Sequence, residues 1–100
     1  MSKTFHARIR FLPTSEGGRL TPPMSGVRPL LKIDDVFTSC IVRSSGATTF
    51  ELGVDYDVTL EVVFWEEYGH LFRADLPVEL FEGSRLVARG VFLPIMPKDT

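Results

Sequence analysis

The sequence contains only one cysteine and two histidines, and this scarcity excludes several kinds of site. Cys40 alone cannot form an intramolecular disulfide, and a zinc site built from several cysteines is impossible. His6 and His70 are too few for a three-histidine metal centre. No apolar run approaches the roughly 20 residues that a membrane span needs, and the N-terminus has no apolar signal-peptide core. We therefore expect a soluble cytoplasmic protein that holds no metal and does not enter a membrane.

Motifs for catalysis and phosphate binding are also missing. The sequence has neither Gly-x-Gly-x-x-Gly nor Gly-x-x-x-x-Gly-Lys-Ser/Thr, the fingerprints of dinucleotide and phosphate-loop sites. Glu67 and His70 have Glu-x-x-His spacing, but one copy supplies too few metal ligands, and Gly69 disfavours the helix that this spacing requires. Cys40 lies in an apolar segment, where a buried and inert thiol is expected. We predict that the protein is not an enzyme and needs no cofactor.

Length and composition predict one folded domain. The chain has 100 residues, of which 44% are hydrophobic and 24% charged, as in ordinary globular domains. We expect a single domain over residues 1–100, with a core from about 5 to 93 and a tail, 94–100, that frays. The net charge of −2 conceals an asymmetry. Residues 1–50 contain seven Lys or Arg and three Asp or Glu, whereas residues 51–100 contain four Lys or Arg and ten Asp or Glu.

Alternating hydrophobicity predicts an all-β fold. In residues 5–11 every second side chain is apolar, which is the period of a half-buried strand. Residues 76–80 and 85–93 flank the turn Glu82-Gly83-Ser84 and are expected to form a hairpin. Further strands are expected at residues 30–33, 38–43 and 58–65. Residues 48–52 follow the turn at residues 44–47 and are expected to pair with the strand before that turn. Six or seven short strands with Gly and Pro turns imply a sandwich or barrel.

No window of the sequence has the periodicity of an amphipathic helix. Residues 61–71 contain the β-branched Val62 and Val63 near their start and are interrupted by Gly69, so we expect a strand and turn there. Trp65, Tyr68 and Phe72 follow this strand, and we interpret them as a plug of the barrel end or as a protein contact. Inward positions are expected for Phe5, Phe11, Phe64 and Phe92.

Residues 13–29 form an unusually long loop, with three glycines and four of the seven prolines. Loops of this length are usually functional or disordered, and the fixed φ of proline favours order here. Arg19 and Arg28 lie in the loop, and Glu16 is its one acid. The loop is therefore expected to be a crossover at one end of the barrel, a binding loop, or both.

The loop and the last hairpin resemble a known family. Residues 16–29 read Glu-Gly-Gly-Arg-Leu-Thr-Pro-Pro-Met-Ser-Gly-Val-Arg-Pro. This run resembles the C-terminal domain of elongation factor Tu, which carries Glu-Gly-Gly-Arg-x-Thr-Pro and then Gly-Tyr-Arg-Pro after its first strand. Residues 81–91 are similar to the final hairpin of that domain. The resemblance covers residues 5–93 and implies an all-β fold, a six-stranded antiparallel closed β-barrel.

In that family the domain packs against a GTPase domain, meets the nucleotide exchange factor and contacts the T stem of aminoacyl-tRNA. The GTPase domain has no counterpart in these residues, so we expect no GTP binding. Leu30 stands where the family has a Gln near the tRNA, and Asp34 and Asp35 add acids beside the expected phosphate. The resemblance implies that the candidate partner- or RNA-binding residues are Arg19, Thr21, Arg28, Glu82 and Gly83.

Two functions are compatible with these patterns. The first is a stand-alone protein-interaction module, which binds an unknown protein through the loop face and the Trp65 cluster. The alternative is a translation-related module that binds RNA, with tRNA as the candidate ligand, through Arg8, Arg10, Arg19, Arg28 and Lys32. Salt distinguishes them, because phosphate contacts release counterions on binding and apolar protein contacts do not.

Overall fold

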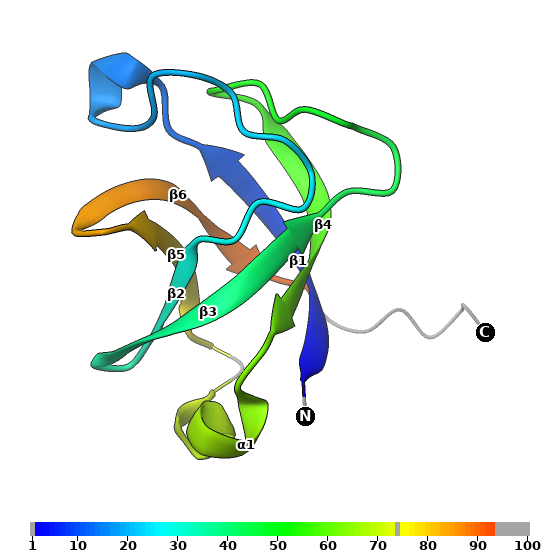
Figure 1. The fold of residues 1–100 in the computed structure, drawn as a ribbon, viewed down its shortest axis with the longest axis vertical. Helices are drawn as coiled ribbons and strands as arrows, with labels where there is room; N and C mark the ends of the chain where they lie inside the picture. The colour runs from blue at the N-terminus through cyan, green and yellow to red at the C-terminus, as the bar shows by residue number, and fades with distance from the viewer. Residues whose placement is uncertain (1, 74, 94–100) are drawn as a thin grey trace.

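The computed structural model describes residues 2–73 and 75–93, so the expected fraying of residues 94–100 lies outside the described residues. These residues form six strands, two 3₁₀ helices and one short α-helix, whose arrangement in space is drawn in Figure 1. In chain order they are β1 (Lys3–Phe11), η1 (Thr14–Glu16), β2 (Leu30–Ile33), β3 (Val36–Arg43), β4 (Asp55–Val62), α1 (Trp65–Tyr68), η2 (Gly69–Leu71), β5 (Pro77–Glu82) and β6 (Arg85–Phe92).

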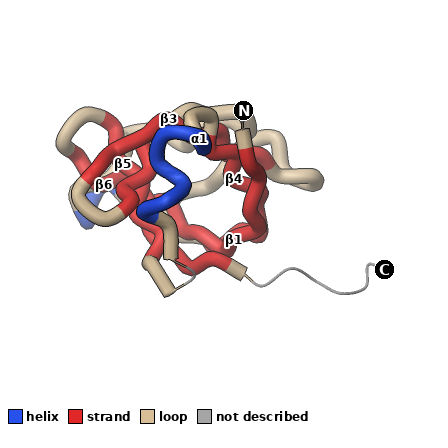
Figure 2. The backbone as a smooth tube through the Cα atoms, turned by 90° about the horizontal axis from the view of Figure 1, so that it is seen from below, coloured by secondary structure: helices blue, strands red, loops and turns tan. Residues whose placement is uncertain are grey.

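The six strands close into a barrel in the order β1-β4-β3-β2-β5-β6. Every neighbouring pair is antiparallel, and β1 completes the ring because it pairs with both β4 and β6. In the view of Figure 2 the strands form a ring, and α1 lies across one end of it. The prediction of an all-β, closed antiparallel barrel of six strands is confirmed.

Side chains from all six strands fill the barrel. Phe11 of β1 stacks on Phe50 with 5.3 Å between ring centroids, and both side chains are fully buried. Such burial of aliphatic and aromatic side chains is the dominant favourable term in folding. The remaining core residues are Ala7, Ile9, Leu31, Ile33, Cys40, Val42, Val58, Leu60, Val62, Val78, Leu80, Val87 and Ala88.

The segment after β4 differs from the sequence prediction. β4 ends at Val62, and the chain then turns into α1 and η2 rather than continuing as strand. The inward position expected for Phe64 is wrong: its side chain is 49% exposed, because the chain has already left the pleat. Trp65 and Phe72 pack on the ring of Phe5, with centroid separations of 5.4 and 4.6 Å. The aromatic cluster thus plugs the barrel end, which is one of the two roles expected for it.

The long loop follows a defined path, as its prolines predicted. Isolated bridges join Met24 to Thr49 and Val27 to Val42. Two amide hydrogen bonds reinforce them, from Gly26 to the carbonyl of Val42 at 2.7 Å and from Phe50 to that of Pro23 at 2.8 Å. The strand expected over residues 48–52 is therefore reduced to a single bridge. These contacts fix the loop on β3 and deliver the chain to the start of β2.

Candidate functional site

Four of the five predicted site residues meet at one end of the barrel. The guanidinium of Arg19 pairs with the carboxylate of Glu82, and its Nε donates to the carbonyl oxygen of Thr21 at 3.0 Å. Gly83 follows Glu82 in the β5–β6 turn with a φ of 63°, a conformation that favours glycine. The Arg19 side chain is 23% exposed, so the pair is partly shielded from solvent. Arg19 and Glu82 therefore fasten the long loop to the last hairpin.

Two further hydrogen bonds hold the same part of the loop. The hydroxyl of Thr14 donates to the carbonyl oxygen of Arg19 at 2.8 Å, and Arg85 Nη1 donates to that of Gly18 at 3.4 Å. A side chain at Gly18 would overlap the backbone of Leu12, so only glycine fits this approach. The fastened loop leaves the side chain of Leu20 77% exposed.

Ion pairs with carboxylates neutralise three of the five basic residues that were candidates for RNA binding. Arg8 pairs with Asp57 at 2.8 Å and Arg10 with Glu16 at 3.3 Å, in addition to the contact between Arg19 and Glu82. The remaining two are Arg28 and Lys32, and neither has an ion pair among residues 2–73 and 75–93. Among the five, Arg28 and Lys32 are therefore the two cations whose charge is not paired with a carboxylate of the described residues.

Arg28 and Lys32 lie on the outer side of the barrel, on either side of Leu30. Leu31 and Ile33 are buried in the core, so Leu30 and Lys32 point outward from β2. The bridge between Val27 and Val42 holds the chain before β2 against β3 in an extended form. Arg28 therefore points to the same side as Leu30 and Lys32, and it is exposed. The structure thus separates Arg28 from the other four predicted site residues.

Two aromatic side chains complete this outer surface. Phe37 lies opposite Lys32 on β3, and Phe81 lies opposite Leu30 on β5. Their rings meet edge to face, with 5.0 Å between centroids and 83° between planes, and the side chain of Phe37 is 44% exposed. We define the β2 outer face as Arg28, Leu30, Lys32, Phe37 and Phe81.

Neither phenylalanine of the β2 outer face is among the site residues predicted from the sequence. The predicted third strand starts at residue 38, whereas β3 begins at Val36 and so includes Phe37. The alternation of side chains along this strand could have indicated that Phe37 points outward, because Thr38 and Cys40 point into the core. Phe81 enters the sequence prediction only as the first residue of the hairpin motif, residues 81–91.

Electrostatic contacts next to the face involve β3 and β4. Arg43 Nη1 donates to Glu61 Oε1 at 2.8 Å, and this hydrogen bond is the main cause that holds the pKa of Glu61 below its ordinary value. The positive charge of Arg28 lowers the pKa of Glu61 as well. Arg28 therefore lies within electrostatic reach of Glu61, at the β4 side of the β2 outer face.

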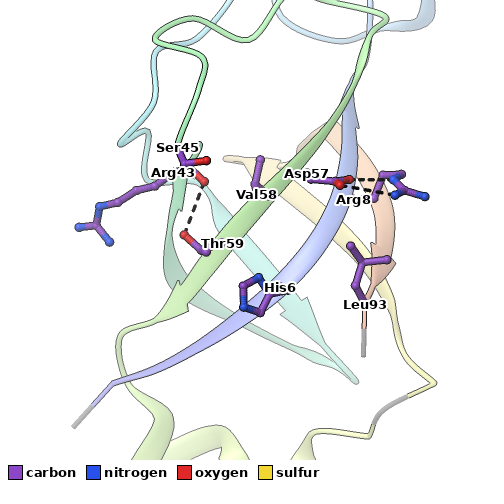
Figure 3. Close-up of a pocket in the computed structure, with 8 residues that line it drawn as sticks. All are labelled: His6, Arg8, Arg43, Ser45, Asp57, Val58, Thr59 and Leu93. Carbon is purple, nitrogen blue, oxygen red and sulfur yellow. Dashed lines mark hydrogen bonds and ion pairs between the residues drawn. The ribbon is translucent and has the colours of Figure 1, made fainter. Parts of the chain in front are cut away.

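A separate hollow of about 550 Å³ runs along the outside of β1 and β4. Figure 3 shows Arg8 and Asp57 paired at one side, His6 near the middle, and the guanidinium of Arg43 pointing away. Its size is that of a small-molecule pocket. Both arginines are already paired with carboxylates, however, so the hollow offers little uncompensated charge to a ligand.

The buried thiol of Cys40 agrees with the sequence prediction. The side chain is fully buried, and burial raises its pKa to about 12. Within the part of the chain that the structure describes, no three His, Cys, Asp or Glu side chains gather as metal ligands would. None of the helices in that part has the length and apolarity to cross a membrane. No protein-family model matches the chain.

Proposed function

We propose that this chain is a non-catalytic β-barrel, similar to the C-terminal domain of elongation factor Tu, that acts as a protein-interaction module. The observation that carries the proposal is the β2 outer face. Its centre is the edge-to-face pair of Phe37 and Phe81, and its cations Arg28 and Lys32 lack an ion pair among the described residues. Aromatic side chains and arginine are enriched at the centres of protein interfaces.

The fastening of the loop supports the likeness to that family. The family motif supplies Arg19 in the loop and Glu82 in the last hairpin, and these two side chains form an ion pair. Because the pair holds the two matching segments together, their joint occurrence in the sequence has a structural reason. This reason concerns the barrel itself, and it leaves the surface around Phe37 open to a different partner.

The proposal is tested by capture of partners on the purified, tagged protein. Phe37→Glu places a charge at the centre of the β2 outer face and should abolish capture of the protein partner. Val91→Glu is the matched control, because Val91 is 54% exposed on the outer side of β6 and lies opposite Arg8 and Pro77. Equal capture by the wild type and the Phe37→Glu variant would contradict the proposal.

Translation-related RNA binding, with tRNA as the candidate ligand, is the second function. The observation that favours it is the exposed ring of Phe37 beside the cation Lys32, because single-stranded RNA is bound by ring stacking and basic side chains. Asp34 and Asp35, both exposed in the adjoining turn, oppose it by repelling phosphate. Retention of tRNA that falls steeply with added salt and is lost in Arg28→Ala would support this function.

A further inference from the structure

We propose that the β2 outer face is self-complementary and that a second copy of this chain docks on it about a two-fold axis. This inference rests on the proposed function and names the partner of the same surface. In a two-fold contact the same patch is used by both copies, so its two ends must be complementary to each other. The charges along the β2–β3 hairpin meet this requirement.

Charge changes sign along the hairpin. Arg28 and Lys32 lie on the outward side of the chain that enters and forms β2, and Asp34 and Asp35 follow in the turn to β3. None of these four side chains has an ion pair among the residues that the structure describes. When two such hairpins lie antiparallel, Arg28 of each copy faces Asp35 of the other.

Apolar contact is available at the centre of the same arrangement. Phe37 is opposite Lys32 and Phe81 is opposite Leu30 in the ladder, so both rings lie between Arg28 and the acidic turn. The β2–β3 hairpin extends from the barrel at the lower left of Figure 1. The outward side chains of this hairpin therefore form an apolar centre that a second copy can contact.

The two aspartates of the turn also favour a second copy of this chain over RNA or an acidic peptide as the partner. Asp34 and Asp35 would repel the phosphates of RNA, and they would repel the carboxylates of an acidic peptide drawn to Arg28 and Lys32. A partner must therefore present both signs of charge around an apolar centre. The chain itself presents that pattern.

Sedimentation equilibrium of the purified protein at micromolar to millimolar concentrations tests the proposal. We expect the wild type to reach twice the monomer mass of 11.2 kDa. Arg28→Asp and Asp35→Arg should each weaken the dimer about tenfold or more, because each places like charges opposite one another. An equimolar mixture of the two variants should regain the dimer, since the altered residues then face each other with opposite charge.

Both substituted positions are exposed, and Asp34, which has a φ of 56°, is left unchanged. Val91→Glu, on β6, should sediment as the wild type does. A wild-type monomer at all concentrations overturns the dimer, and the proposed function then still stands if Phe37→Glu abolishes capture of another protein. A wild-type dimer that the mixture of variants fails to restore overturns the pairing of Arg28 with Asp35. If the protein is monomeric and Phe37→Glu changes no capture, both proposals fail.

Discussion

Phe37 and Phe81 belong to strands that do not pair with each other, yet their rings touch across the outer side of β2. The strand between them contributes Leu30, which is opposite Phe81 in the ladder. An edge-to-face pair on the outside of a barrel contributes less to stability than the stacked pair of Phe11 and Phe50 inside it. It does place apolar surface where another molecule can reach it.

The difference between these pairs predicts two stability effects. Phe37→Ala should lower the free energy of unfolding by about 1 kcal/mol, because it removes one aromatic contact from a surface that is already partly exposed. Phe11→Ala should lower it by about 3–5 kcal/mol, because it leaves a cavity in the core. Urea denaturation measures both. Similar losses for the two variants would mean that Phe37 is part of the folding core.

Arg19 and Arg28 should respond differently to substitution. Arg19→Ala removes the ion pair with Glu82 and the hydrogen bond to Thr21, so we expect a loss of about 1–2 kcal/mol. Arg28→Ala should change stability by less than about 0.5 kcal/mol, because Arg28 is exposed and has no ion pair among the described residues.

A double-mutant cycle with Glu82→Ala assigns the Arg19 effect to its partner. The coupling between the two positions should account for most of the loss measured for Arg19→Ala. Additive effects would show that the ion pair does not fasten the loop.

The thiol of Cys40 should be inert in the folded protein. It is fully buried, and its pKa of about 12 leaves almost no thiolate at pH 8. We expect reaction with a disulfide reagent such as DTNB only when the protein unfolds, at a rate that rises with urea. Fast reaction in native buffer would indicate that the barrel opens locally between β3 and β4.

Acid should destabilise the protein through two surface ion pairs. The hydrogen bond from Arg8 holds the pKa of Asp57 below its ordinary 3.8, and that from Arg43 holds the pKa of Glu61 below its ordinary 4.5. A carboxyl with a lower pKa when folded contributes its full stability above the unfolded value and loses it as pH falls through the folded value. Asp57→Asn should therefore show a shallower loss of stability below about pH 4 than the wild type, by thermal unfolding across pH.

Much of the barrel could be predicted from the sequence because its strands alternate cleanly. The alternation of Phe5, Ala7, Ile9 and Phe11 survives in β1, since one face of that strand meets the core and the other meets solvent. Phe64 was misplaced because alternation shows where a strand runs but not where it ends. The end of β4 at Val62 is set by the packing of Trp65 and Phe72 on Phe5.

The candidate site was less predictable, because it depends on contacts between distant segments. Arg19 and Glu82 are 63 residues apart in the sequence. Neither motif alone indicates that the two side chains form an ion pair. Phe37 and Phe81 become neighbours only through the strand order of the closed barrel. The sequence therefore supplied the cation Arg28, whereas the aromatic centre of the β2 outer face required the structure.

The most direct test of the account is photo-crosslinking from position 37. A benzophenone amino acid replaces Phe37 in cells, and the same residue replaces Phe64, which is similarly exposed but lies beyond the end of β4, as the control. The account predicts that light joins position 37 to a protein, that the product resists ribonuclease, and that position 64 does not form it. A product at position 37 that ribonuclease removes would contradict the account and support RNA binding.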